Sequence, residues 1–246
     1  MISLENVSKV FGKAGKAPAF VAVEGLNLEI PEGQMVALLG KTGCGKSTIF
    51  NMVAGLTAPT SGRVLVDGKD PFGDFDAFIG KMAIVFQGDR LLPWRSALQN
   101  VQLGLEMLDR PAAERRAIAS HWLETLGLAG HVNDYPHALS GGMRQRVSIA
   151  RAFAVDAKIL LCDEPFSALD EMTGRALRSE FARLVKSNNK TAIFITHSID
   201  EALAIGDRIV VLTRPATVAI DFTFDRTASE FDRERIRDRI HAALAV

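Results

Sequence analysis

Eight consecutive residues near the N-terminal third of the chain constrain its fold more than any other feature. The segment Gly40-Lys41-Thr42-Gly43-Cys44-Gly45-Lys46-Ser47 fits the pattern G-x-x-x-x-G-K-[ST]. The residues before it, 34–39, are nearly all apolar and predict a buried strand, and residues 47–54 predict a helix. A strand that passes through a glycine-rich loop into a helix is typical of an α/β fold.

The residue types in this loop predict phosphate binding. Glycines allow consecutive backbone N–H groups to turn inward around phosphate oxygens, and the following helix adds the positive end of its dipole. Lys46 places a cation beside the phosphates, and the hydroxyl of Ser47 is an oxygen ligand of the kind Mg²⁺ prefers. We expect the loop and Thr48 to contact a nucleotide, and Cys44, at a free position of the pattern, to have no redox role.

Strands and helices alternate along most of the chain, which predicts a parallel sheet with helices on its faces. In the middle of the chain, Ile118, Trp122 and Leu126 recur every four residues, with Ala119 and Leu123 beside them, and Pro111 suits a first helical turn. We therefore predict a single domain, 1–246, in which an α-helical subdomain, 88–155, is inserted into an α/β core, 1–87 and 156–246. The expected strands are 4–10, 21–30, 34–39, 62–66, 82–86, 158–162, 191–195 and 208–212, with further helices at 171–186 and 230–246.

An acidic pair follows one of these strands. The apolar run 159–162 ends in Asp163 and Glu164. Open α/β folds bind ligands at the carboxyl ends of their strands, so Asp163 is suited to hold Mg²⁺ and Glu164 to polarise an attacking water molecule. Adjacent carboxylates in this position can also be helix caps or surface charges. The phosphate loop favours the functional interpretation, because phosphoryl transfer needs both parts.

The overall charge excludes some classes of partner. Lys and Arg number 29, and so do Asp and Glu, which does not point to a nucleic acid.

Only two cysteines occur, so we expect a reducing compartment. The sequence shows neither a secretory signal nor an apolar run of about 18 residues, and we expect the chain to be soluble and to need a partner for any membrane role.

The segment Leu139-Ser140-Gly141-Gly142-Met143-Arg144-Gln145 resembles the signature of ABC ATPases in its LSGGxxQ form. Ser140 is expected to cap a helix that runs toward Phe153, although a capped helix alone is common. Other family motifs follow the same order: Gln87 matches the Q-loop, Ser167-Ala168-Leu169-Asp170 the D-loop, and His197 the H-loop. Phe11 matches the aromatic residue that stacks on adenine; Phe20 is the alternative, and either can be a core residue.

This resemblance implies a P-loop NTPase of the ABC ATPase fold, with an N-terminal antiparallel β subdomain beside a mainly parallel core sheet. It implies an ATPase that works as a head-to-tail dimer, with ATP and Mg²⁺ between the phosphate loop of one subunit and the signature helix of the other. The implied catalytic residues are Glu164, His197 and Gln87; the implied metal ligands are Ser47, Gln87 and Asp163; Ser140, Gly141, Gly142, Gln145 and Asp170 are implied to contact the nucleotide.

Residues 90–101 (RLLPWRSALQNV) resemble the LLPW…NV segment of subunits that serve nitrate, sulfonate, taurine or bicarbonate importers. This resemblance implies membrane permease subunits that dock near Gln87 and Leu91–Trp94, a periplasmic or extracellular substrate-binding protein, and a peripheral location on the cytoplasmic face of the membrane. Trp94 could instead pack inside the helical subdomain. An exporter, a lipid-handling ATPase and a non-hydrolysing regulatory subunit are the alternatives.

Overall fold

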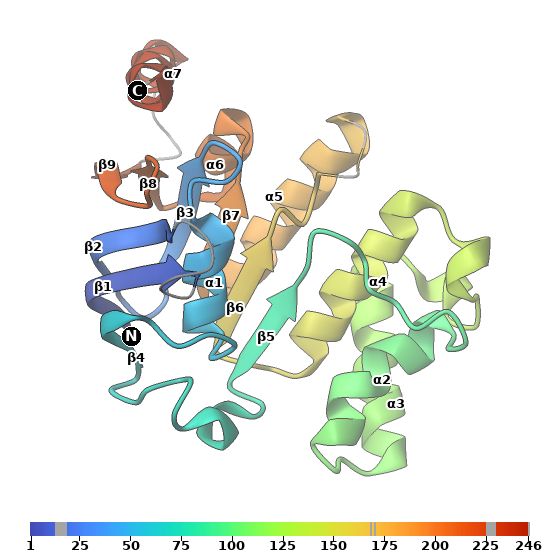
Figure 1. Ribbon diagram of the computed structural model, residues 1–246. Coiled ribbons are helices and arrows are strands. Elements are labelled where there is room, and N and C mark those ends of the chain that lie inside the picture. The colour runs from blue at the N-terminus through green and yellow to red at the C-terminus, as the bar shows by residue number, and fades with distance from the viewer. Residues whose placement is uncertain (13–18, 168, 170, 225–229, 246) are drawn as a thin grey trace. The chain divides into compact units, whose positions relative to one another are not determined.

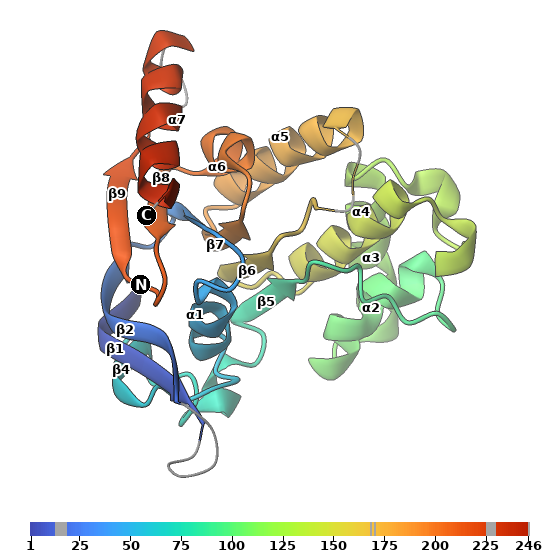
Figure 2. The same ribbon diagram turned by 45° about the horizontal axis from the view of Figure 1, so that its top comes forward.

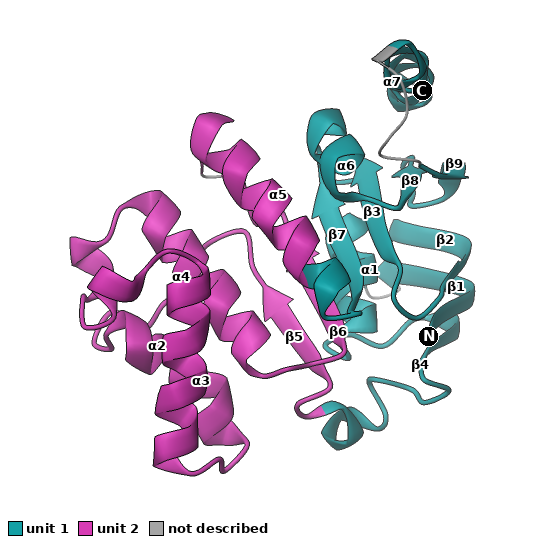
Figure 3. Ribbon diagram, turned by 180° about the vertical axis from the view of Figure 1, so that it is seen from behind, with its two compact units in different colours: residues 1–78, 185–246 teal, residues 79–184 magenta. Residues whose placement is uncertain are grey.

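A computed structural model of the chain (Figure 1) describes residues 1–12, 19–167, 169, 171–224 and 230–245. The chain divides into two compact units. Unit 1 comprises residues 1–78 and 185–246, and unit 2 comprises residues 79–184 (Figure 3, teal and magenta).

Unit 1 contains an antiparallel sheet and a set of mainly parallel strands. The antiparallel sheet has the order β2 (Phe20–Ile30), β1 (Ile2–Phe11), β4 (Ser61–Val66). The other strands follow the order β7 (Thr191–Thr196), β3 (Met35–Gly40), β8 (Arg208–Leu212), β9 (Val218–Thr223); the first three are parallel and β9 is antiparallel. Every residue of β3 and β7 is buried, as near-continuous apolar runs in a parallel sheet require.

The helices of unit 1 are α1 (Lys46–Val53), α6 (Ile199–Ile205) and α7 (Glu230–Ala245), with a short 3₁₀ helix at Phe75–Phe78. α7 lies beside β8 and β9 (Figure 2), where Ile236, Ile240 and Leu244 pack on the apolar core formed with α6. Arg237 of α7 donates to Asp200 of α6 at 2.8 Å. The expected closing helix is therefore present, and its i+4 apolar residues face the core.

Unit 2 is mainly helical. α2 (Ala97–Met107), α3 (Ala112–Thr125) and α4 (Gly141–Ala154) come between the parallel strands β5 (Met82–Val85) and β6 (Ile159–Asp163), and α5 (Glu171–Ser187), which follows β6, ends in unit 1. Short 3₁₀ helices occupy Ala129–His131 and Pro136–Ala138. Phe153 packs against both Trp122, with ring centroids 5.0 Å apart, and Phe181, at 5.9 Å.

These elements confirm the expected α/β class with an antiparallel β sheet, parallel core strands and helices inserted in the chain between two of them. One detail of α3 differs from the sequence pattern. Ala119, Leu123 and Leu126 of the predicted apolar face are buried, whereas Ile118 and Trp122 are only half-buried. No helix within the described ranges is both long and apolar enough to cross a membrane.

Candidate functional site

The glycine-rich loop joins β3 to α1, and two of its glycines are required by close packing. A Cβ atom on Gly40 would lie 2.6 Å from Cys44 Sγ, and one on Gly45 would lie 2.4 Å from the carbonyl oxygen of Ala22. Gly45 also has φ 117°, and Gly43 has φ 78°, values that favour glycine. The loop is therefore held in a shape that other residues cannot adopt, while Gly43 faces open space.

Lys46 lies folded inside this loop. Its side chain is buried, and Nζ donates to the carbonyl oxygens of Gly40 at 2.6 Å and Lys41 at 3.0 Å. Gly45 supplies no side-chain cap to α1, and the first turn of α1 contains no acidic residue. Backbone N–H groups at an uncapped helix start, together with a cation and the exposed hydroxyl of Ser47, fit a phosphate group and its Mg²⁺.

His197 lies at the same edge of unit 1 as the loop. β3 and β7 are parallel, and Leu39 pairs in register with Thr196. The next residues along the two strands are Gly40 and the exposed His197. The structure thus brings the phosphate loop and the predicted H-loop histidine to neighbouring strand ends, where α/β folds bind ligands.

A buried hydrogen-bond network, which the sequence analysis missed, holds the turn that carries His197. Thr196 Oγ1 donates to Glu201 Oε2 at 2.6 Å and accepts from the backbone N–H of Ser198 at 3.0 Å. Ser198 caps α6 in turn by accepting from the N–H of Glu201 at 3.3 Å. Thr196 and Glu201 are both buried, so this network fixes the chain on either side of His197.

We expect Thr196→Val to destabilise the protein by about 2 kcal/mol, because it leaves the partly buried N–H of Ser198 and a buried carboxylate oxygen of Glu201 each without one hydrogen bond. The measurement is the midpoint of urea unfolding. Thr223→Val, at an exposed position of β9, is the matched control and should change stability by less than about 0.5 kcal/mol. Equal unfolding midpoints for the two variants would show that the network does not stabilise the turn.

Phe11 and Phe20 face each other as register partners in β1 and β2. Both rings are about two-fifths exposed, at 43% and 41%, so neither is a core residue. Each carries a cation at 5.2 Å from its ring centroid, Lys9 over Phe11 and Arg214 over Phe20. Both therefore present an aromatic face suited to stacking, and both alternatives remain predictions.

A cavity of about 190 Å³ lies against the phosphate loop. Its walls combine residues of the loop, of the segment after β8 and of the C-terminal part of α7: Lys41, Thr42, Cys44, Leu212, Thr213, Arg214, Ala243 and Leu244. The sequence analysis assigned α7 only a closing role, and the structure adds that its last turn borders the loop.

In unit 2, the predicted glutamine and the acidic pair meet at the ends of β5 and β6. Val85 pairs in register with Cys162, and Gln87 Nε2 donates to Glu164 Oε2 at 3.2 Å. Asp163 is the last residue of β6. Glu164 has φ 43°, a left-handed conformation that costs of order 1–3 kcal/mol for a residue with a side chain and recurs at active sites.

The thiol beside this acidic pair is chemically inert. Burial, and secondarily the charge of Asp163, raises the pKa of Cys162 well above its ordinary value. Cys162 therefore remains protonated and acts as a small apolar residue of β6.

The predicted signature helix is α4, and Ser140 caps it as expected. Ser140 Oγ accepts from the N–H of Met143 at 3.3 Å, and Ser140 and Gly141 are exposed. Gln145, by contrast, is only 3% exposed, and its Nε2 atom has no hydrogen-bond partner among the described residues. The predicted role of Asp170 lies outside the described residues, although nearby Ser167 donates to the Glu164 carbonyl at 3.0 Å.

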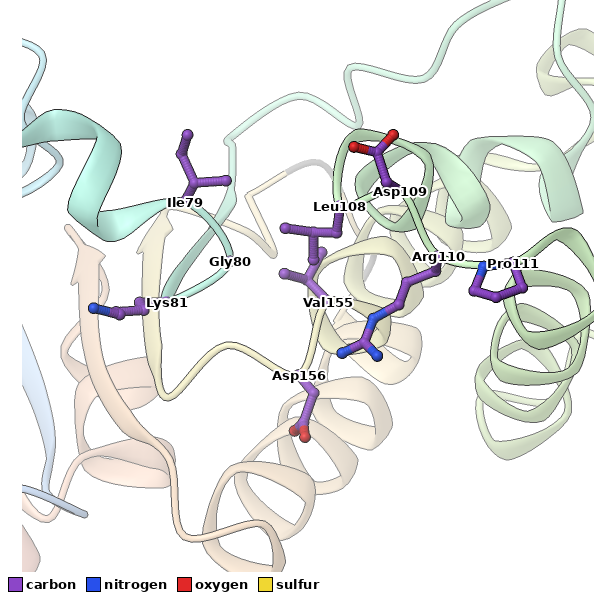
Figure 4. A pocket seen from close by; sticks show the side chains of 9 residues that line it. All are labelled: Ile79, Gly80, Lys81, Leu108, Asp109, Arg110, Pro111, Val155 and Asp156. Carbon is purple, nitrogen blue, oxygen red and sulfur yellow. The ribbon is translucent and has the colours of Figure 1, made fainter.

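The predicted site residues thus fall into two groups, one in each unit. Unit 1 carries the phosphate loop, His197 and the two phenylalanines, and unit 2 carries Gln87, the acidic pair and the signature helix. A separate open cavity of about 560 Å³ in unit 2 (Figure 4) is lined by none of the predicted site residues. Its lining residues are Ile79, Gly80, Lys81, Leu108, Asp109, Arg110, Pro111, Val155 and Asp156.

Comparison with known proteins gives a consistent result. The family model described as ABC transporter matches residues 23–167. An ABC transporter ATP-binding protein of Methanocaldococcus jannaschii is 41% identical over 97% of this chain and 85% of its own length. A bicarbonate transport ATP-binding protein of Synechocystis is also 41% identical, over 97% of this chain and 82% of its own.

A nitrate import ATP-binding protein of Synechococcus elongatus is 39% identical over 90% of this chain and 79% of its own. Among solved structures, a dimeric ATP-binding cassette in a post-hydrolysis state, bound to ADP and phosphate, is similar with a TM-score of 0.81 and 34% identity. The similarity covers 92% of this chain and 99% of that one.

Proposed function

Because the chain belongs to the ABC transporter family, we propose that it is the ATP-hydrolysing subunit of an importer that moves a small anion through separate membrane subunits. The chain is an ABC-type ATPase that uses ATP with Mg²⁺. The anion class we propose is that of nitrate, sulfonate, taurine or bicarbonate, and two relatives named for bicarbonate transport and nitrate import support it.

We assign the binding of the nucleotide to residues of unit 1. Lys46 would exchange its loop carbonyl partners for phosphate oxygens, and the uncapped amides at the start of α1 would donate to the same phosphates. The ring of Phe11 or Phe20 would stack on the adenine. His197, at the neighbouring strand end, would contact the γ-phosphate. The complete loop set is Gly40, Lys41, Thr42, Gly43, Cys44, Gly45, Lys46, Ser47 and Thr48.

Unit 2 supplies the groups for hydrolysis. Ser47 from the loop, with Gln87 and Asp163, would hold Mg²⁺, which neutralises phosphate charge when bound. Glu164 would accept a proton from the attacking water molecule, and the hydrogen bond from Gln87 Nε2 orients its carboxylate. The left-handed backbone at Glu164 is supporting evidence, because such conformations cluster at active sites.

A second copy of the chain would complete the nucleotide site. Its α4 would offer Ser140, Gly141 and Gly142 to the γ-phosphate, and we also assign nucleotide contacts to its Gln145 and Asp170. The dimeric state of the similar cassette supports this arrangement. ATP binding would then favour a closed dimer, and loss of the γ-phosphate would open it.

The surface that we propose for the membrane subunits is the segment 91–94. Trp94 is 70% exposed, yet its loop is firmly held, because the fully buried Asn100 accepts from Leu92 N at 2.7 Å and donates to the carbonyls of Leu92 and Arg95 at 3.2 and 3.0 Å. A rigid loop that presents a large apolar side chain favours a protein partner. Trp94 is the observation that carries the proposal, and its exposure supports a peripheral location at the cytoplasmic face of a membrane, with a substrate-binding protein as an indirect partner.

Trp94→Ala tests this proposal. We expect ATP turnover by the purified chain to stay within about twofold of wild type, and the recovery of membrane subunits that co-purify with the chain to fall about tenfold or more, as for a central interface aromatic residue. Met107→Ala, at an equally exposed position at the end of α2, is the control and should not change recovery.

The identity of the recovered subunits decides the class of transporter. Recovery of importer permeases that transport nitrate, sulfonate, taurine or bicarbonate would support the proposal. Exporter or lipid-handling membrane domains, or recovery that is unaffected by Trp94→Ala, would contradict it.

A further inference from the structure

The turn that follows Gln87 is built around one carboxylate. Asp89 Oδ1 accepts from the backbone N–H of Leu91 at 3.1 Å, which fixes the start of the proposed docking segment. Arg90, between them, has a left-handed backbone with φ 48°. The position of Leu91 therefore depends on where the side chain of Asp89 is held.

Two arginines of α4 hold this turn. Arg151 donates two hydrogen bonds to the backbone of the turn. Its Nη2 donates to the carbonyl oxygen of Asp89 and its Nη1 to that of Arg90, both at 2.8 Å. Burial lowers the pKa of Arg151, and the charge of Asp89 acts against that shift. Arg144, seven residues earlier and so on the same face of the helix, donates from Nε to Asp89 Oδ2 at 2.9 Å.

Arg144 has a second partner at the signature motif. Its NH1 donates to the carbonyl oxygen of Leu139 at 2.7 Å, and Leu139 directly precedes Ser140. A single planar guanidinium therefore contacts both the turn that leads into the docking segment and the peptide that places Ser140. The ion pair is about one-third exposed on each side, 36% for Arg144 and 30% for Asp89, so solvent screens it only partly.

We propose that Arg144 is a positioning residue that couples the docking segment 91–94 to the signature serine, Ser140. The inference rests on the proposed function, because it assigns a consequence to docking at Trp94 and to the role of Ser140. A displacement of Leu91 by a membrane subunit moves Asp89, and Arg144 transfers that movement to the peptide before Ser140. In this assignment Asp89 and Arg144 act by setting the position of Ser140, through the bonds of Arg144 to Asp89 and to the Leu139 carbonyl.

The test compares the isolated chain with the complex it forms with its co-purified membrane subunits in lipid vesicles. For Arg144→Gln we expect the ATP affinity of the isolated chain and its KM to stay within about twofold of wild type. We expect kcat of the complex to fall about tenfold, the size of a typical coupling between sites. Arg183→Gln removes an equivalent charge from the exposed pair with Glu180 on α5 and should leave both values unchanged.

Asp89→Asn provides a second variant that keeps the acceptor for Leu91 and loses the charge. It should reproduce the fall in kcat, and the double variant should be no worse than Arg144→Gln, because both changes break one link. Additive losses, or a complex that keeps wild-type kcat in either single variant, would overturn the inference. A wild-type chain that recruits no membrane subunits would instead contradict the proposed function, so the two failures are distinguishable.

Discussion

Glu164→Gln should nearly stop ATP turnover while leaving nucleotide binding intact. The amide cannot take a proton from water, and loss of a general base costs about 10²- to 10⁴-fold in rate. Glutamine keeps an oxygen that can accept from Gln87 Nε2, so the contact seen at 3.2 Å can persist. The measurement is steady-state phosphate release, together with equilibrium binding of ATP.

The same substitution should change the oligomeric state. If hydrolysis opens the dimer, a chain that binds ATP without hydrolysing it accumulates as a closed dimer, which size-exclusion chromatography with Mg-ATP detects. Glu180→Gln, which changes a carboxylate paired with Arg183 on α5, is the control and should remain active. Wild-type turnover in Glu164→Gln would show that Glu164 is not the general base of the reaction.

The parts of the site that the sequence predicted are those encoded by consecutive residues. The phosphate loop was predictable because strand, glycines, lysine and helix follow one another within twenty residues, and each has a local physical reason. Ser140 was predictable as a helix cap for the same reason, because the cap and its N–H donor, Met143, are three residues apart. The roles assigned to these residues in binding ATP remain predictions.

Elements whose stability depends on a neighbour were missed. β9 (VAIDFT) was not predicted, because its residues are mostly exposed and its partner in the sheet, β8, supplies the pairing. α6 is short, and its start depends on the Ser198 cap and on the bond between Thr196 and Glu201. A regular pattern of apolar residues, the signal used to find strands and helices, is weak in both segments.

Long-range pairs were beyond the sequence altogether. Asp89 and Arg144 are 55 residues apart, and nothing in either local segment indicates that they meet. In α3 the helix and its apolar residues were predicted, but the full burial of Ala119 and Leu123, and only partial burial of Trp122, depends on how the helices pack against one another. Tertiary packing therefore decided what local pattern left open.

Lys46→Ala should weaken ATP binding about 10- to 100-fold, because it removes charge-assisted hydrogen bonds that contribute about 1.5–3 kcal/mol. The lysine is positioned in advance: Nζ is held inside the loop by the carbonyls of Gly40 and Lys41. In the proposed complex, Lys46 would exchange these neutral acceptors for phosphate oxygens, which bear negative charge and bind an ammonium more strongly.

The measurement is the equilibrium affinity for ATP, with unfolding midpoints to confirm that the variant is folded. Lys69→Ala, at an exposed lysine after β4, alters the net charge equally and should bind ATP as the wild type does. Because the backbone amides and the glycine geometry of the loop remain in Lys46→Ala, residual binding is expected. Undiminished affinity in a folded Lys46→Ala protein would mean that the ammonium does not reach the phosphates, and the loop would then be a glycine-rich turn that serves only the fold.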